Sequence, residues 1–504
     1  MQKTDVLIVG AGPTGLVLAL WLQAQGVSVR IIDKTSAPGT TSRAMVVHAR
    51  TLELYRQLGM ADAVAAAGHP SRVVNMWARG KRRAQIDMRD FGGDITPYPY
   101  LLIFPQDHHE SFLCDQLAAR GLTIERNTEL LDAKDEGDQV TATLRGPDGK
   151  TQTCTTRFMV GADGAASTVR KGLGGKFKGG TYRSLLYVAD VEVAQDMFNG
   201  NVHLSFEETD FLLVFPYGTE GKMRLVGSIR PERVARSDDL NFEDVGRESL
   251  HALGIQVTHL NWFSTYKSHH RMTDRFRHGN IFLAGDAAHI HSPAGGQGMN
   301  TGIGDAINLA WKLAAVVNGR GNDALLESYH AERAAFARTL IKTTDQAFNL
   351  ASRKGSVFGF MRTYVVPNVA KLAFGLASAR AGMFRAISQV AITYADGPLG
   401  VGKAGEVSGG DRLPFVHLDK GDNFGPLADI IWQVHVYGQP TDALRTWCSD
   451  RDVPLHVFGW NAACAAAGLE RDAAYLVRPD TYVGCAAPQG DTQMLETYMA
   501  GLGF

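Results

Sequence analysis

Residues 5–33 read DVLIVGAGPTGLVLALWLQAQGVSVRIID, and this stretch decides the fold. It opens with DVLIV, a continuous apolar run typical of a buried strand, which leads into the turn Gly10–Gly15. Leu16–Gln25 has a helical pattern, and a second strand over Val27–Ile32 ends at Asp33. Strand, glycine turn, helix and strand make a βαβ unit, so we predict a doubly wound α/β domain that opens at residue 5.

The glycine turn has the spacing of a dinucleotide-binding site. Gly10, Gly12 and Gly15 let a pyrophosphate approach the backbone at a helix N-terminus, where free N–H groups and the helix dipole favour negative charge. Asp33 lies where a carboxylate accepts hydrogen bonds from a ribose diol. A GxGxxG alone is weak evidence, but here the strand, the helix and the acidic residue all agree. We therefore predict dinucleotide binding, with further contacts from Pro13, Thr14 and Lys34.

A second motif, GADGAASTVR over residues 161–170, follows the apolar strand Phe158–Val160. Considered alone, it predicts a strand–turn–helix corner in which Ser167 caps the helix and Asp163 bonds its own turn.

A third motif, IFLAGDAAH over residues 281–289, precedes the glycine-rich segment PAGGQGMN over residues 293–300. Gly285 permits a close approach at the end of a strand, and Asp286 can hydrogen-bond a polyol. The glycine-rich segment opens a helix whose N–H groups can face the electron-poor edge of a flavin ring. A turn without catalytic relevance is the alternative, and the density of glycines beside Asp286 argues against it.

The pattern changes between Tyr182 and about Thr265. Alternating strands at Val202–Phe206, Phe211–Phe215 and Met223–Ser228 predict a mostly antiparallel sheet inserted into the α/β domain. The α/β pattern returns after it, with a strand at 280–284 and helices over 302–317 and 327–350. A glycine-rich linker after Gly400 leads to a small α/β module. We divide the chain into a first domain over residues 1–180 and 266–399 with a helical extension, an inserted domain over 181–265, and a C-terminal domain over 400–504.

Composition excludes several classes of protein. The 504 residues are 45% hydrophobic and 20% charged with a net charge of −1, which removes the electrostatic reason to expect nucleic acid or an anionic membrane as a partner. No uncharged apolar run reaches the roughly 18 residues that span a bilayer. The cysteines are scattered and never spaced as CxxC, so we expect no disulfide framework, no zinc site and a reducing, cytoplasmic location. They are Cys114, Cys154, Cys448, Cys464 and Cys485.

The three motifs together resemble the class A flavoprotein aromatic hydroxylases, the family of para-hydroxybenzoate hydroxylase and phenol hydroxylase. The resemblance covers about Asp5 to Thr344, with the motifs in the family's order and spacing. It implies an FAD-dependent monooxygenase that hydroxylates a small aromatic substrate, either phenolic or polycyclic and polyketide-like. It further implies that NADPH or NADH binds transiently and reduces FAD, which reacts with O₂ to give a flavin hydroperoxide. An electron-rich ring carbon of the substrate then attacks the distal oxygen.

The resemblance also assigns roles to the motif residues. The three glycines of the first turn hold the pyrophosphate of FAD, and Asp33 holds the adenosine ribose. Asp163 belongs to a motif associated with FAD and the nicotinamide cofactor. Asp286, beside Gly285, holds the ribityl and pyrophosphate region. The isoalloxazine ring is lined by Pro293, Gly295, Gly296, Gln297, Gly298, Met299 and Asn300.

Two further residues are candidates by the same resemblance, and a third is a candidate from its position on the inserted sheet. Arg43 matches an arginine that contacts the flavin, and Gln106 matches a residue that reaches the cofactor. Tyr217, on the inserted sheet, and Arg43 are our candidate catalytic residues, although a core tyrosine is at least as frequent at such a position. We expect His289 and His291 to be structural, and no metal is required.

The C-terminal module resembles the thioredoxin-like domain of phenol and polyketide hydroxylases, on the residues Asp411–Pro414 and Leu476–Asp480. Without a CxxC, thiol–disulfide chemistry is not expected, and a structural or oligomerisation role leaves a homodimer open. The predicted fold is therefore α/β: a Rossmann-like FAD-binding domain, an inserted, mostly antiparallel β substrate domain and a C-terminal thioredoxin-like domain. Alternatives are Baeyer–Villiger oxygenation, oxidative decarboxylation or a non-catalytic flavin-binding protein, whereas the halogenase motif GWxWxIP is absent.

Overall fold

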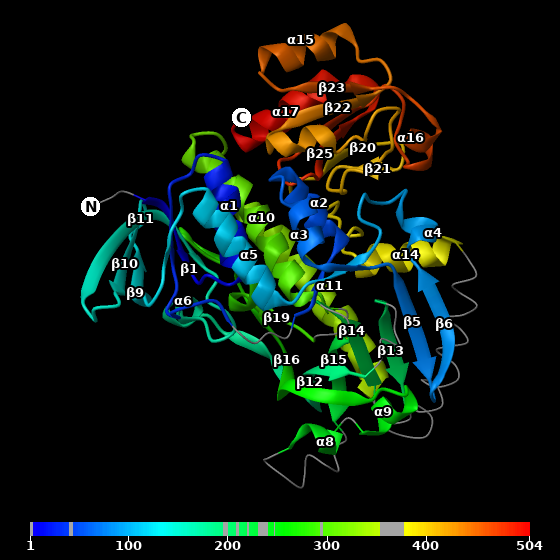
Figure 1. Cartoon of the computed structure of the whole chain (residues 1–504). Helices are drawn as coiled ribbons and strands as arrows, with labels where there is room; N and C mark the ends of the chain where they lie inside the picture. Colours follow the sequence, from blue (N-terminus) through cyan, green and yellow to red (C-terminus); the bar gives the residue numbers. More distant parts are fainter. Residues whose placement is uncertain are drawn as a thin grey trace.

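A computed structural model describes residues 4–39, 44–194, 200–207, 211–218, 221–229, 240–245, 247–292, 296–352 and 377–504. Figure 1 shows a C-terminal module, orange to red, and a second sheet at opposite ends of the molecule, with the helices of the first domain between them.

The first sheet has the order β17-β18-β11-β1-β2-β8. The strand β1 (Thr4–Val9) lies between β11 (Thr151–Gly161) and β2 (Val29–Ile32), and β11 also pairs with β18 (Ile281–Leu283), all in parallel. Strands buried on both faces are continuous apolar runs, which is the pattern of DVLIV. Because parallel strands end at the same edge, the turns after β1, β11 and β18 meet there. The remaining strands of this sheet are β8 (Ile124–Glu125), β9 (Glu129–Asp135), β10 (Val140–Arg145) and β17 (Arg277–His278).

Three helices pack together beside this sheet: α1 (Pro13–Ala24), α5 (Gln106–Ala119) and α10 (Gly298–Val317). The helices predicted over 302–317 and 327–350 are confirmed as α10 and as α11 (Asp323–Ser352). Each of them starts four residues earlier than predicted. Shorter helices and a small sheet of the order β3-β7-β4 complete this part of the chain. They are β3 (Val46–Val47), α2 (Ala49–Gln57), α3 (Ala61–Ala67), β4 (His69–Ser71), α4 (Arg89–Gly92), β7 (Leu101–Ile103), α6 (Thr168–Gly172) and α14 (Ala377–Ile387).

The second sheet has the order β19-β16-β12-β15-β14-β13-β5-β6, in which β19 covers His289–Ile290. The three predicted strands are present, as β13 (Val202–Phe206), β14 (Phe211–Pro216) and β15 (Lys222–Ile229). Two long strands, β12 (Phe177–Val193) and β16 (Val257–Thr273), connect this sheet to the first domain. All pairs are antiparallel except β13 with β5.

The second sheet extends beyond the residues 181–265 that we assigned to the inserted domain. The strands β5 (Val73–Ala78) and β6 (Lys81–Asp87) belong to it, although they fall within the range assigned to the first domain. The physical reason is that β13 would otherwise leave an edge of unpaired N–H and C=O groups, which β5 covers. This pairing joins residues more than a hundred positions apart, so local alternation cannot reveal it.

The two faces of the second sheet have different partners. The outer face is covered by α8 (Phe242–Val245) and α9 (Arg247–Ala252) and carries Tyr187, Ala189, Val191, Leu212, Val214, Met223, Leu225 and Ile229. The inner face packs toward the core of the first domain and carries Phe206, Phe211, Leu213, Phe215 and Val226. The apolar pattern of the sequence allows those five residues, with Trp77 and Tyr100, either to line an aromatic pocket or to form a plain sheet core. Trp77 packs instead with the outer cluster, and Tyr100 is buried in the main core.

The C-terminal module is built on a sheet of the order β21-β20-β25-β24-β22-β23, with parallel and antiparallel pairs. Its core includes Trp311 of α10 and Leu325 of α11, so its packing is continuous with the first domain. Its elements are β20 (Val401–Ala404), β21 (Val407–Ser408), β22 (Gln433–Tyr437), α15 (Asp442–Asp450), β23 (Leu455–Phe458), α16 (Ala462–Ala466), β24 (Ala474–Val477), β25 (Val483–Ala487) and α17 (Thr492–Leu502). None of the helices within the described ranges is long and apolar enough to cross a bilayer.

Candidate cofactor and substrate site

The three sequence motifs meet at one edge of the first sheet. Successive turns are joined by backbone hydrogen bonds: the Gly10 N–H donates to the Ile32 carbonyl over 2.9 Å, and the Ala162 N–H donates to the Val9 carbonyl over 2.8 Å. The Ala284 N–H donates to the Gly161 carbonyl over 3.0 Å. The edge is therefore one continuous surface of backbone.

Glycine is required where these turns approach each other. A Cβ on Gly15 would lie 1.9 Å from the carbonyl oxygen of Gly10. Gly285 has a φ of +60°, and a Cβ there would lie 2.6 Å from Oγ1 of Thr14. Thr14 belongs to the first motif and Gly285 to the third, so the two turns touch. This confirms the convergence on which a shared cofactor site depends.

The N-terminus of α1 is open to an anion. Gly12 is the N-cap and offers no side-chain hydrogen bond, and Pro13 occupies the first turn. The space beside Gly12 holds no protein atom within 4 Å of an added Cβ. The first N–H groups of a helix lack intrahelical partners, so a pyrophosphate can approach them here.

Asp33 is held beside this helix terminus. Its Oδ2 accepts a hydrogen bond from the Ala11 N–H over 2.6 Å, and its Oδ1 accepts one from the Thr35 N–H over 2.7 Å. Arg126 Nη1 lies 3.9 Å from Oδ2, a neighbour that no sequence motif indicated. Lys34, the next residue, is exposed. The carboxylate is thus oriented by the glycine turn itself, which suits recognition of a ribose.

The second motif forms the corner that its residues alone predict. Asp163 Oδ2 accepts hydrogen bonds from the N–H groups of Thr168 and Val169, over 2.6 and 3.2 Å. The hydroxyl of Ser167 caps α6 by accepting from the Arg170 N–H over 2.9 Å. Asp163 Oδ1 is buried and has no hydrogen-bond partner among the described residues, so it is available to a bound group.

The third motif places the carboxylate of Asp286 directly after Gly285, the glycine that contacts the first turn. The side chain of Asp286 is exposed, yet protein surrounds its carboxyl group closely enough that burial raises its pKa. An exposed carboxylate in such dense surroundings can accept hydrogen bonds from a polyol that lies along the edge.

The buried carboxylate of Asp305 holds the Gly285–Asp286 turn by a hydrogen bond. Asp305, on α10, accepts hydrogen bonds at Oδ2 from the Gly285 N–H over 2.9 Å and from His289 Nε2 over 2.7 Å. Arg333 Nε donates to its Oδ1 over 2.6 Å. Burial opposes ionisation, but Arg333 and His289 overcome it and lower the pKa of Asp305 to about 2. Sequence patterns missed Asp305 and Arg333, since each falls in an ordinary helical stretch.

The two histidines of this loop have protein partners. His289 bonds Asp305, as just described, and His291 Nδ1 lies 2.7 Å from the Ser292 carbonyl oxygen. Burial lowers the pKa of His291 to about 4, so its ring is neutral at pH 7. Within the described part of the chain, no three His, Cys, Asp or Glu side chains are grouped so as to hold a metal ion.

The start of α10 is the segment that the resemblance places against the flavin ring. Gly296 has a φ of +63°, and the N-cap residue Gln297 makes no side-chain hydrogen bond to the first turn of the helix. The side chain of Gln297 therefore leaves the N–H groups of this turn open to the edge of a flavin ring. The side chain of Asn300 is buried, however, and bonds His48 N–H and the Val46 carbonyl over 2.9 and 2.8 Å. Its amide joins the start of α10 to the chain that follows Arg43. The predicted residues Arg43, Pro293 and Gly295 lie outside the described residues.

Gln106 opens α5 beside the same segment. Its N–H donates to the Ala44 carbonyl over 3.2 Å, and its Nε2 donates to Glu110 Oε1 over 2.7 Å. Glu110 is a further polar neighbour that the motifs did not indicate, and burial raises its pKa.

The inner face of the second sheet carries a buried ion pair. Arg224 Nε and Nη2 donate to the two carboxylate oxygens of Asp190, over 2.6 and 2.7 Å. The guanidinium lies 5.8 Å from the ring centre of Tyr217 and 5.9 Å from that of Trp262. Burial, together with the charge of Asp190, raises the pKa of Tyr217 to about 12. Tyr217 therefore stays protonated at neutral pH and can donate a hydrogen bond.

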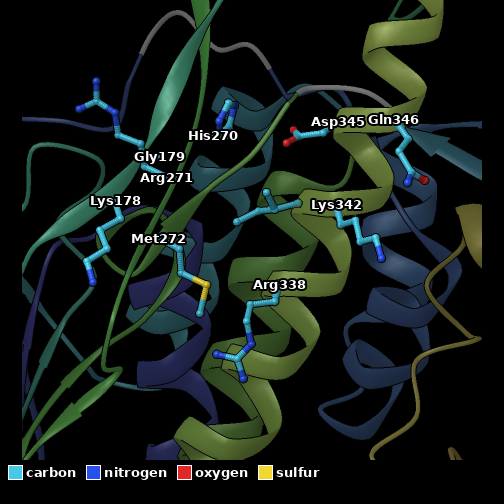
Figure 2. A pocket seen from close by; sticks show the side chains of 10 residues that line it. Lys178, Gly179, His270, Arg271, Met272, Arg338, Lys342, Asp345 and Gln346 are labelled. Atoms are coloured by element: carbon cyan, nitrogen blue, oxygen red, sulfur yellow. The ribbon is translucent and has the colours of Figure 1, made fainter.

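A cavity of about 570 Å³ lies between β12, β16 and α11 (Figure 2). Met272 and Ile341 supply apolar walls, and both His270 Nδ1 and Asp345 Oδ1 are buried without a hydrogen-bond partner among the described residues. Met272 pairs with His289 of β19 (His289–Ile290), so the cavity adjoins the loop of the third motif.

The cations around this cavity do not converge on it. Figure 2 shows Lys178 and Arg271 extending away from α11, and Lys342 extending away from the strands. Arg338 lies on the side of α11 that faces the strands. An apolar cleft with a few polar groups suits an aromatic ring better than a polyanion.

Comparison with known proteins agrees with this geometry. The family model for an FAD binding domain matches residues 3–344. The chain is 37% identical over 415 residues to 6-methylpretetramide 4-monooxygenase from Streptomyces rimosus, covering 80% of this chain and 72% of that protein. It is 31% identical over 516 residues to a flavin-dependent monooxygenase from Mycobacteroides abscessus, covering 97% and 98% of the two chains.

A solved structure extends the likeness to the whole chain. OxyS, an anhydrotetracycline hydroxylase from Streptomyces rimosus, superposes with a TM-score of 0.79 at 27% identity, covering 100% of this chain and 99% of OxyS. The similarity therefore includes the second sheet and the C-terminal module.

Proposed function

The chain belongs to the class A flavoprotein aromatic hydroxylases, and from this premise we propose that it adds one oxygen atom from O₂ to a polycyclic, polyketide-like phenol at the expense of NAD(P)H. FAD-dependent aromatic hydroxylation follows from the family. The choice of a polycyclic substrate over a simple phenol rests on relatives named for 6-methylpretetramide and anhydrotetracycline. The observation that carries the function is the contact of Thr14 with Gly285, because it joins the two turns that one FAD molecule must span.

The residues at the edge of the first sheet fit FAD. The N–H groups at the start of α1 would hold the pyrophosphate, Asp33 the adenosine ribose and Asp286 the ribityl chain. The uncapped start of α10 would face the ring. When bound, FAD supplies the hydride-accepting and oxygen-activating chemistry, and the protein supplies position and electrostatics.

The inner face of the second sheet suits the substrate. Its aromatic and aliphatic side chains exclude water from the reacting ring, which an oxygen transfer of this kind requires. Tyr217, whose hydroxyl is protonated at neutral pH, would donate a hydrogen bond to the phenolic oxygen. Arg224 and Asp190 hold the neighbourhood of Tyr217 rigid. Arg43, which lies outside the described residues, remains our second catalytic candidate.

The cavity beside β19 supports the same placement. Met272, like Trp262 and Tyr266, packs toward the main core, so the cavity continues the inner face at the end nearest the third motif. The unpartnered atoms of His270 and Asp345 can bond a hydroxyl group of a fused-ring substrate.

We assign a thioredoxin-like fold to the C-terminal module, without thiol chemistry. All three of its cysteines are buried and free. Burial raises the pKa of Cys448 to about 11 and that of Cys485 to about 12, so neither thiol is a ready nucleophile.

The test is a screen of NADPH and NADH oxidation by the FAD-loaded enzyme against simple phenols, hydroxybenzoates and fused-ring quinones. The expected result is oxidation stimulated by a fused-ring compound, with a product heavier by one oxygen atom. Loss of CO₂ would indicate oxidative decarboxylation, and an ester or lactone product would indicate Baeyer–Villiger chemistry. Bound FAD with no aromatic stimulation would leave a non-catalytic flavoprotein.

A further inference from the structure

The C-terminal module is tied to α11 by buried charges. Arg478 Nη1 and Nη2 donate to the two carboxylate oxygens of Glu332, over 2.7 and 3.1 Å. Arg478 also bonds Asp480, whose Oδ2 accepts from the indole N–H of Trp311 over 3.0 Å. The side chains of Arg478 and Glu332 are fully buried. Lys312 Nζ donates to Glu332 as well, so α10, α11 and the module share one ionic cluster.

Arg333, the next residue of α11, leads from the module toward the cofactor edge. Its Nη1 donates to the hydroxyl of Tyr394 over 2.7 Å, and its Nε donates to Asp305 over 2.6 Å. Tyr394 is joined to the module, because its N–H donates to the Gly410 carbonyl over 2.8 Å and its ring lies 4.5 Å from that of Tyr482.

Asp305 completes the connection at the third motif. The same carboxylate that accepts from Arg333 accepts the Gly285 N–H, which belongs to the turn that presents Asp286. Asp305, Arg333 and Tyr394 are all buried. Hydrogen bonds in a buried charged network are strong because little water screens them, so these three side chains hold one another in position.

We propose that the C-terminal module is part of the cofactor site: through Tyr394, Arg333 and Asp305 it holds the Gly285–Asp286 turn in the geometry that binds FAD. This inference rests on FAD binding at that turn. Asp305 and Arg333 are positioning residues, because they act on FAD through the backbone of Gly285. The module then has a role that neither thiol chemistry nor an independent binding function supplies.

The first test removes one hydroxyl group at the module end. Tyr394→Phe deletes the acceptor for Arg333, and Tyr498→Phe is the matched control, since its buried hydroxyl bonds the Leu399 carbonyl outside the network. FAD is titrated into each apoprotein and followed by flavin fluorescence. Tyr394→Phe is expected to weaken FAD binding by roughly threefold to tenfold, and the control by less than about twofold.

A second pair of measurements distinguishes an effect on how FAD is held from an effect on the stability of the protein. The visible circular dichroism of bound FAD reports how the ring is held, and the melting temperature of the apoprotein reports folding. We expect Tyr394→Phe to change the dichroism while its apoprotein melts like that of Tyr498→Phe. Asp305→Asn, which leaves Arg333 without its carboxylate, is expected to weaken FAD binding by roughly tenfold to a hundredfold.

Two results would overturn the proposal. One is a Tyr394→Phe protein that binds FAD with wild-type affinity and dichroism. The other is equal weakening in Tyr394→Phe and Tyr498→Phe, which would make the effect one of general stability. Failure of the unaltered chain to bind FAD is a different outcome, because it would overturn the proposed function itself.

Discussion

The edge of the first sheet and the inner face of the second sheet build their sites from different materials. At the edge, backbone N–H groups and glycine turns form the surface, and Thr14 of the first turn contacts Gly285 of the third. On the inner face, the polar groups are the side chains of Asp190, Tyr217 and Arg224, which come from β12, the end of β14 and β15. A site built from backbone groups requires glycine at particular positions in the sequence. A site built from side chains requires that particular strands lie next to each other in the sheet.

The largest expected effect falls on the side-chain site. Arg224→Ala leaves Asp190 buried without its partner, which we expect to lower the stability of the protein by about 3–5 kcal/mol. The double variant Arg224→Met with Asp190→Leu removes both charges, so most of this stability should return while hydroxylation remains impaired. Urea denaturation and the ratio of product formed to NAD(P)H consumed measure the two effects. A single variant as stable as the wild type would contradict the importance of the pair.

The site at the edge of the first sheet is tested by adding one methyl group to Gly15. Gly15→Ala places a Cβ 1.9 Å from the Gly10 carbonyl oxygen, a clash with backbone that no side-chain rotation relieves. We expect FAD binding to weaken by about a hundredfold. Gly93→Ala is the control, since nothing lies within 4 Å of its added Cβ, and it should bind FAD normally. Equal FAD affinity in the two variants, measured by equilibrium dialysis, would show that the turn is not the pyrophosphate site.

Acid should destabilise the buried pairs Asp305–Arg333 and Glu332–Arg478 behind the edge more than it destabilises exposed ion pairs, because the pKa of each buried carboxylate is lowered further. Asp305 and Glu332 have pKa values lowered to about 2, from ordinary values of 3.8 and 4.5. Because the folded pKa lies below the unfolded one, their contribution to stability is present above about pH 4.5 and is lost as the pH falls toward 2. FAD release followed by fluorescence should rise over this range. Asp148→Asn, at the exposed ion pair with Lys150, should leave the acid profile unchanged.

The smallest expected effect concerns a single hydroxyl on the inner face. Tyr217→Phe should lower the rate of product formation by roughly threefold to tenfold, the value of one hydrogen bond to the substrate. FAD affinity should not change, because Tyr217 lies on the second sheet. Stopped-flow measurement of hydroxylation, with FAD titration as control, separates the two. An unaltered rate would remove Tyr217 from the catalytic candidates.

Much of the fold was readable from local patterns. The apolar runs and glycine turns located β1, α1, β11, β18 and the start of α10, because each depends on a few consecutive residues. The strands β13, β14 and β15 followed from alternation. The assignment of β5 and β6 to the second sheet, and of Trp77 to its outer face, did not follow.

By itself, the sequence indicated a nucleotide-binding edge built from glycine turns, because backbone geometry at a turn is dictated by adjacent residues, and its three motifs resembled those of the flavoprotein hydroxylases. Tertiary structure alone decided that Asp305 and Arg333 lie behind that edge, that Asn300 bonds the Val46 carbonyl, and that Asp190 meets Arg224. Such contacts join positions tens to hundreds of residues apart. Strand pairing and helix packing bring these residues together. The residues that meet therefore have no regular spacing in the sequence that could reveal the contact.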